Sequence, residues 1–243
     1  MEEEYIEYNG EKIYFNIQRK KIKNINLKVS IDKTVTISIP YRVSLEKAKE
    51  FILSKAEWIK KQQKVYEKSS LKKDSGTFRN GEIVYLLGNP YKINIISDKN
   101  NFININNEYI DIHVKEKYIL NQKYIKTLYE KYLKEYARKI YIDLIIKYQQ
   151  MIKNYKIEIP ELEIKKMKSR WGTCIPSKKK IVLNFSLIKT PICCIEYVVL
   201  HELSHFKYQN HSKNFYDFIS MFMPDWKERR RILNKEYAGI TYE

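Results

Sequence analysis

The stretch Val198–Phe215 reads VVLHELSHFKYQNHSKNF and contains three of the chain's four histidines. If it begins as a helix, His201 and His205 stand at positions i and i+4, so their rings project from one face about 6 Å apart along the axis. Such a pair can hold one metal ion through two ring nitrogens. Glu202 then points partly away from the ion and can act on a water, as the general base of an HExxH zinc site. The stretch therefore predicts a metal-bearing helix.

A third ligand is needed, because catalytic zinc takes three protein ligands and keeps one position open. His211 lies six residues after His205, where a continuing helix would turn it away. The helix must therefore end between them, with Asn210 as the predicted left-handed cap. The histidine spacing equals that of the metzincins, HExxHxxGxxH, but Tyr208 replaces their glycine. HExxH also arises by chance on amphipathic helices, so the third histidine carries much of the prediction of a zinc site formed by His201, His205 and His211.

Length and composition indicate a folded protein without a membrane segment. A chain of 243 residues with 44% hydrophobic and 14% aromatic residues can form one large or two small domains. The opening MEEEYIEYNG is acidic and has no apolar core, so we expect no signal peptide. No run of about 18 apolar residues occurs. The three cysteines have no CxxC spacing, which favours reduced thiols and a cytoplasmic location.

The net charge of +17 raises the question of nucleic acid as a partner. A basic surface attracts phosphate without sequence preference. Here the excess is almost all lysine, scattered along a chain that is also rich in isoleucine, asparagine and tyrosine. A genome rich in A and T would produce the same bias. Nucleic-acid binding therefore stays an alternative, which a steep loss of DNA affinity with salt would support.

The pattern of the first 113 residues predicts strands around one helix. Alternating runs such as IYFNIQ (13–18), INLKVSI (25–31) and TVTISIP (34–40) are typical of an antiparallel sheet, with a hairpin at Asp32–Lys33. Ser44 is a predicted N-cap for a helix that continues to Lys68. Further strands follow in IVYLLG, YKINII and FINI. We therefore predict an α+β fold, with a β-rich N-terminal region over residues 1–113 and a helical catalytic region over residues 114–243.

The second region opens with a predicted helix over residues 116–153, followed by two or three short strands before the metal-bearing helix. Among those strands, the group Ser169–Gly172 (SRWG) combines a small residue with Arg170, whose side chain could hold a carboxylate or an oxyanion. After the histidines, two more helices are expected. We interpret the basic run Arg229–Arg231 as solvated.

Four motifs resemble those of the YgjP-like metallopeptidases, a bacterial group near the SprT-like zinc proteins. They are SRWGTC (169–174), IVLNFSLIKTP (181–191), EYVVLHELSHFKYQNHSKNFY (196–216) and MPDWKERRRIL (223–233). Their order and spacing agree with the family's pattern, and Thr173 replaces the family's usual serine. Weaker matches extend upstream, so the resemblance covers nearly the whole chain.

The resemblance implies a zincin-like catalytic part with zinc on the three histidines and Glu202 activating water. It also implies that the SRWG segment lies beside the metal as an edge strand that could align an extended peptide. Our leading hypothesis is zinc-dependent hydrolysis of a peptide or protein substrate. The predicted substrate or transition-state contacts are Arg170, Trp171 and Tyr216.

Two alternatives keep the metal but change the substrate. Parts of the family carry a nucleoside triphosphate hydrolase label, which suggests a pyrophosphohydrolase acting on UTP, although no GxxxxGK[ST] loop is present. The SprT-like relatives instead suggest a protease that acts on DNA-bound proteins. Pyrophosphate release from UTP or DNA-stimulated cleavage would separate these activities from ordinary peptide hydrolysis.

Overall fold

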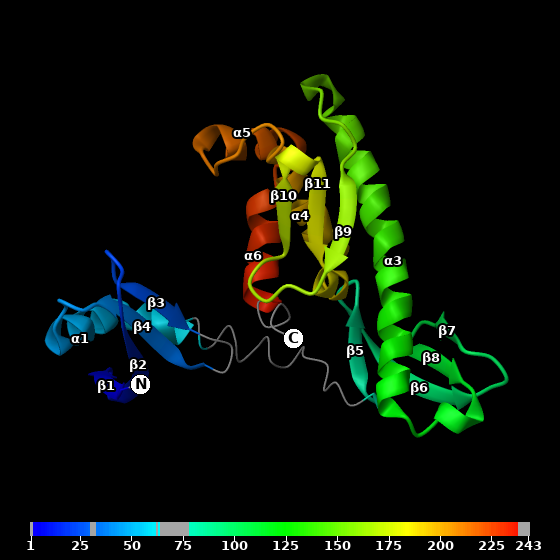
Figure 1. Ribbon diagram of the computed structural model, residues 1–243, viewed down its shortest axis with the longest axis horizontal. Coiled ribbons are helices and arrows are strands. Elements are labelled where there is room, and N and C mark those ends of the chain that lie inside the picture. Colours follow the sequence, from blue (N-terminus) through cyan, green and yellow to red (C-terminus); the bar gives the residue numbers. More distant parts are fainter. Residues whose placement is uncertain (1, 30–32, 62, 64–77, 238–243) are drawn as a thin grey trace. The chain divides into compact units, whose positions relative to one another are not determined.

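The computed structural model describes residues 2–29, 33–61, 63 and 78–237. The chain forms two compact units, Met1–Leu71 and Lys72–Glu243, and each has its own hydrophobic core (Figure 1). The fold is α+β, as the sequence predicts. The sequence-based boundary at residue 113 falls inside the second unit, where strands give way to a long helix.

The first unit is a four-stranded sheet with a helix. Its strands are β1 (Glu2–Tyr8), β2 (Glu11–Lys20), β3 (Asn26–Val29) and β4 (Val35–Pro40). Their order is β1-β2-β4-β3, with β2 and β4 parallel in the centre and antiparallel pairs on both sides. Helix α1 (Leu45–Ser54) starts after Ser44, whose side chain accepts from the Lys47 N–H, and residues 56–61 are also helical. The rest of the predicted helix and most of the hairpin turn at Asp32 lie outside the described residues.

The second unit repeats this topology. Strands β5 (Ile83–Leu86), β6 (Asn89–Ser97), β7 (Phe102–Ile105) and β8 (Tyr109–Val114) have the order β5-β6-β8-β7, again with a parallel central pair. The first hairpin of each sheet turns through two residues with positive φ: Asn9 (51°) and Gly10 (77°), or Leu87 (50°) and Gly88 (83°). This is the backbone of a type I′ turn, which matches the twist of the flanking strands.

The two equivalent turns differ in their surroundings. A Cβ atom on Gly10 would meet nothing within 4 Å, whereas one on Gly88 would lie 2.8 Å from Cγ of Pro191. The N–H groups of Leu87 and Gly88 donate to the carbonyls of Ile188 and Lys189 at 2.8 and 3.1 Å. The β5–β6 turn is therefore fixed against the segment that leads into the histidine-bearing helix.

A single long helix links the two halves of the second unit. Helix α3 (Gln122–Met151) lies between the short 3₁₀ helices η1 (Glu116–Tyr118) and η2 (Lys153–Tyr155). It is shorter than the predicted 116–153 because Asn121 caps it, with its side chain accepting from the Tyr124 N–H at 3.0 Å. Figure 1 shows it running from the β5–β8 sheet to strand β9. Within the described ranges, no helix combines the length and apolarity needed to cross a bilayer.

The last part of the chain surrounds a small sheet. Strands β9 (Glu161–Lys165), β10 (Gly172–Ile175) and β11 (Lys180–Asn184) have the order β10-β11-β9, which leaves β10 at an edge. The 3₁₀ helix η3 (Pro176–Lys178) joins β10 to β11, and η4 (Phe185–Lys189) precedes the terminal helices α4 (Ile192–Ser204), α5 (Lys213–Phe222) and α6 (Trp226–Glu236). Helix α4 packs against α3, α5, α6 and β10. The expectation of short strands before this helix is confirmed.

Candidate metal centre

The clustered histidines lie at the C-terminal end of α4, which is the most enclosed helix of the unit. Its apolar residues from Cys194 to Leu203 are buried on several faces rather than along one stripe, as expected for a central helix. Close packing leaves such a helix little room to shift. His201 lies on its last turn and His205 is the residue that ends it, so both rings have well-defined positions.

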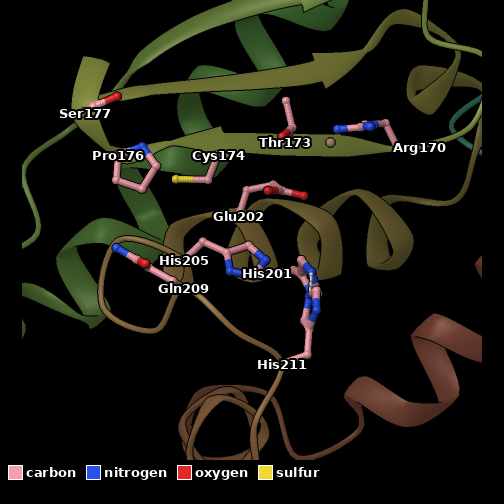
Figure 2. A pocket seen from close by; sticks show the side chains of 11 residues that line it. Arg170, Thr173, Cys174, Pro176, Ser177, His201, Glu202, His205, Gln209 and His211 are labelled. Atoms are coloured by element: carbon pink, nitrogen blue, oxygen red, sulfur yellow. Dashed lines mark hydrogen bonds between the residues drawn. The ribbon is translucent and has the colours of Figure 1, made fainter.

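The rings of the three histidines converge (Figure 2). Their centroids are 4.8–4.9 Å apart in all three pairs, and the Nε2 atoms of His201 and His211 are 2.9 Å apart. One ligand nitrogen from each of the three rings lies within 4.8 Å of the other two. Nitrogens that lie about 2.0–2.1 Å from a tetrahedral zinc ion are about 3.3 Å apart, which is inside the observed range. The donor set fits a zinc ion.

The loop that returns His211 to the site begins earlier than the sequence suggested. Helix α4 ends at Ser204, and the N–H of Tyr208 donates back to the Ser204 carbonyl at 2.9 Å. Asn210 has no positive φ, so its predicted role as a left-handed cap is wrong. Its carbonyl instead accepts from the Ser212 N–H at 2.8 Å, just before α5 begins. A hydrogen-bonded turn, rather than a left-handed residue, directs the chain back.

The orientation of the His205 ring is set by a backbone carbonyl. Its Nδ1 lies 3.0 Å from the carbonyl oxygen of Tyr208. A carbonyl can only accept, so Nδ1 carries the proton and Nε2 keeps its lone pair for a ligand bond. Nδ1 of His201 lies 3.4 Å from the hydroxyl of Tyr197, one turn earlier on the helix. In His205, Nε2 is therefore the nitrogen left for a metal, and in His201 it is Nε2 that faces His211.

A single aromatic ring supports all three imidazoles. The Phe215 ring centroid lies 4.9, 4.7 and 4.8 Å from those of His201, His205 and His211, and the side chain is fully buried. The sequence predicts Phe215 only as a packing residue of the helix after the site. It is also the surface on which the histidine cluster rests, because α5 folds back under α4.

Burial favours the neutral form of His201 and His211. It lowers the pKa of His201 to about 3, and the neighbouring His205 and His211 act in the same direction. The pKa of His211 is lowered by burial and then by His205. A neutral imidazole has a lone pair on its unprotonated nitrogen. Near neutral pH these two rings therefore offer nitrogen donors rather than repelling a cation.

Glu202 points from α4 toward strand β10, on the far side of the helix turn from the ring cluster (Figure 2). Only 5% of it is exposed. Burial raises its pKa to about 8, although a hydrogen bond from the Cys174 N–H and the charge of Arg170 both lower it. A divalent cation held by the histidines would favour the charged carboxylate. A buried carboxylate that lines the same cleft as the histidines is thus a further sign that the site suits a cation.

The histidines and Glu202 line one cleft of about 680 Å³ between α4 and the β10 segment. Figure 2 shows Arg170 near one end of β10 and Ser177 beyond the other, with Cys174 between them on the side of the helix. Thr173 also lines the cleft. Gln209, from the loop after α4, closes part of the opposite side. The cleft is therefore elongated along an edge strand, with the donor cluster at its centre.

The three predicted substrate contacts occupy different places. Arg170 lines the cleft. Trp171 lines a smaller neighbouring cavity, and its carbonyl accepts from the Asn184 N–H at 2.8 Å. Tyr216 lines neither cavity and stacks on Trp226, with ring centroids 4.6 Å apart. The roles of all three in binding stay predictions, and Arg170 has the most direct access.

Asn184 is a positioning residue that the sequence does not reveal. Its side chain is fully buried and donates to the carbonyls of Met167 and Arg170 at 2.7 and 2.9 Å. The same amide accepts from the Ser186 N–H at 3.1 Å. Asn184 therefore holds the loop that presents Arg170 to the cleft. Asn184 belongs to the IVLNFSLIKTP motif, which draws attention to it, but its hydrogen-bond partners Met167 and Arg170 lie too far away along the chain to be inferred from the sequence.

Gly172 allows Glu202 to approach β10. A Cβ atom at this position would lie 2.7, 2.8 and 3.0 Å from Oε1, Cγ and Cδ of Glu202. We expect Gly172→Ala to displace the carboxylate and to lower the turnover rate by about 10- to 100-fold, because small misplacements of a catalytic group have effects of this size. Metal content should not change. Zinc analysis and steady-state kinetics on the purified variant check both outcomes.

Gly81→Ala is the matched control for this variant, because an added Cβ there meets nothing within 4 Å. Its positive φ of 81° makes it somewhat less stable, but its turnover rate at 25 °C should equal that of the wild type. A Gly172→Ala protein with normal turnover would show that the position of Glu202 does not limit the reaction.

A family model described as YgjP-like, metallopeptidase domain, matches residues 23–236. The comparison with curated proteins found no match. The matched range includes the whole of the cleft, its histidines and Glu202.

Proposed function

This chain belongs to the YgjP-like family, and from that premise we propose that it is a zinc-dependent peptidase. The family description supports a metal-dependent hydrolase of the peptidase type. What supports the finer proposal above all is that the histidine cluster and the carboxylate of Glu202 line the same cleft. Three nitrogen ligands with access to a cleft are the donor set of catalytic zinc, whereas structural zinc has four protein ligands.

His201, His205 and His211 would hold the ion, which supplies a Lewis acid that acidifies water and polarises the scissile carbonyl. Glu202 accepts a proton from the attacking water and passes it to the leaving nitrogen. Its position against Gly172 and the Cys174 N–H fixes the direction of its lone pairs. Arg170 lines the same cleft and is a candidate donor for the negative charge that develops on the carbonyl oxygen.

Strand β10 provides a means of aligning an extended substrate. It pairs with β11 on one side, and no other strand in the described ranges pairs with its second side. The Cys174 N–H already points to Glu202 on that second side. Because backbone groups alternate along a strand, the N–H and carbonyl of Gly172 and the carbonyl of Cys174 lie on the same side and can pair with a substrate, while Glu202 accepts the Cys174 N–H. An extended peptide that pairs there would pass directly beside the histidine cluster.

The test is metal-dependent cleavage of a mixed peptide library by the full chain. We expect zinc-loaded protein to cut peptides, chelator-treated protein to be inactive, and added zinc to restore cleavage at the same bonds. Mass spectrometry of the products identifies the cleaved bonds and their flanking residues. Absence of any cleavage by protein that contains one zinc per chain would refute the peptidase proposal.

The nucleotide and DNA-linked alternatives stay predictions and can be included in the same assay. UTP incubated with the zinc-loaded protein should release no pyrophosphate if the peptidase proposal is correct. Added duplex DNA should not change the rate of peptide cleavage, whereas a DNA-associated protease would be stimulated. The cytoplasmic location and the choice between peptide and protein substrate likewise stay predictions.

A further inference from the structure

A second, smaller cavity of about 190 Å³ adjoins the cleft. The two share Arg170, Gly172, His201 and Glu202, so the small cavity begins where the proposed reaction takes place. Its remaining lining comes from Trp171, from Tyr197 and Val198 of α4, and from Arg230, Leu233 and Asn234 of helix α6. A substrate bound at Glu202 can therefore extend a group into this cavity.

Two arginines contribute positive charge to this cavity, and the charge of Arg170 acts on the carboxylate of Glu202, which lines the same cavity. In the part of the chain that the structure describes, neither Arg170 nor Arg230 forms an ion pair with a carboxylate. The neighbours of Arg230 on α6 do: Arg229 pairs with Glu196 and Asp225 at 2.5 and 2.8 Å, and Arg231 pairs with Glu228 at 2.5 Å. Of the three consecutive arginines, the one that lines the cavity is the one without a carboxylate partner among the described residues.

Arg230 is nevertheless held in place. Its Nη1 donates to the hydroxyl of Tyr216 at 3.3 Å, and its guanidinium carbon lies 5.9 Å from the centre of that ring. Tyr216 is itself stacked on the buried Trp226. An aromatic ring orients a guanidinium without cancelling its charge. Asn234, one turn further along α6, adds an amide on the same helix face.

We infer that the cavity bounded by Arg170, Arg230 and Asn234 is a subsite for a carboxylate of the peptide substrate. Two guanidinium groups and an amide supply hydrogen-bond donors for carboxylate oxygens, and guanidinium binds such oxygens in a fixed fork geometry. The carboxylate belongs either to an acidic side chain beside the scissile bond or to a free C-terminus. This inference rests on the proposed peptidase function and adds to it a preference for substrates that carry a carboxylate near the scissile bond.

The test compares four peptides that share the best sequence from the library assay. The first is neutral and amidated; the second and third carry glutamate on one or the other side of the scissile bond; the fourth is neutral with a free C-terminus close to it. We expect at least one carboxylate peptide to have a kcat/KM about tenfold or more above the neutral peptide, since charge-assisted hydrogen bonds have effects of this size. Which peptide gains identifies the source of the carboxylate.

Variants of α6 test whether the preference for a carboxylate peptide arises in this cavity. Arg230→Gln should reduce the preference by about tenfold, and Arg230→Glu should favour a lysine peptide over a glutamate one. Arg231→Gln is the matched control, because Arg231 is the next residue on the same helix but pairs with Glu228. It should keep both the rate and the preference of the wild type. Equal kcat/KM for all four peptides with the wild type would overturn the subsite and leave the peptidase proposal intact.

A binding measurement separates failure of the subsite from failure of the proposed function. Zinc-loaded Glu202→Gln protein is titrated calorimetrically with the same peptides, with and without Arg230→Gln. Tighter binding of a carboxylate peptide that is lost with Arg230→Gln supports the subsite even if the wild type cleaves nothing. Equal affinities for the carboxylate and neutral peptides would overturn it whether or not cleavage occurs.

Discussion

Replacing Glu202 with glutamine should abolish turnover while leaving the metal in place. Glutamine has nearly the same shape and can still accept the Cys174 N–H, but its amide cannot take a proton from water near neutral pH. Loss of a general base lowers rates by about 10²- to 10⁴-fold. Glu202 is not among the three nitrogen donors of the cluster, so zinc should stay at about one ion per chain. Steady-state kinetics and mass-spectrometric metal analysis on the same preparation measure both quantities.

The control for this substitution is Glu158→Gln. Glu158 is an exposed carboxylate paired with Lys179 at 2.7 Å, and it does not line the cleft. It should behave as wild type in both measurements. If Glu202→Gln cleaves peptides as fast as wild type, another group must activate the water, and the cleft would need a different base.

The second large effect is expected from His205→Ala, which should lose zinc and activity together. His205 supplies one of the three convergent nitrogens, and a hydrogen bond from its Nδ1 to the Tyr208 carbonyl orients its ring. Loss of an outer-shell partner alone weakens metal binding by about 10- to 100-fold, so loss of a direct ligand should exceed this. Metal analysis after dialysis should give about one zinc per chain for the wild type and little for the variant.

The fourth histidine provides the matched control. His113 lies on β8, with Nδ1 3.1 Å from Oδ2 of Asp98 and its ring stacked on Phe102. His113→Ala also removes an imidazole but leaves the cluster complete, so it should retain zinc and turnover. Circular dichroism establishes that both variants are folded. Equal zinc in His205→Ala and the wild type would mean that the cluster does not hold the metal.

The sequence predicted the parts of the site that depend on local spacing. His201 and His205 converge because residues four apart on a helix share a face, and this holds whatever surrounds the helix. The strands were also predictable, since alternation of apolar residues reports which face of a strand is buried. The helix end was not. Its cap was placed at Asn210, yet the chain turns earlier through the hydrogen bond from Tyr208 to Ser204.

Features that depend on distant partners could not be predicted. The sequence does not distinguish between Arg229, Arg230 and Arg231. Only the packing of α6 beside α4 decides which of these arginines lines the cavity and which form ion pairs. Asn184 looks like a polar residue that ends a strand, but its amide holds the backbone of Arg170. The boundary between the two units could not be predicted for the same reason. The alternation of apolar residues in the strands of residues 83–114 does not indicate which helix packs against them.

The β1–β4 and β5–β8 sheets use one topology in two different settings. Order, strand directions and the two-residue turn at Asn9–Gly10 or Leu87–Gly88 all correspond, and each sheet is followed by a helix. The first sheet forms a core of its own with the helix that follows it, whereas the second belongs to the core that contains α4 and contacts the start of that helix through its turn at Gly88, which abuts Pro191. The same strand arrangement is thus a separate unit in one place and a brace for the histidine-bearing helix in the other.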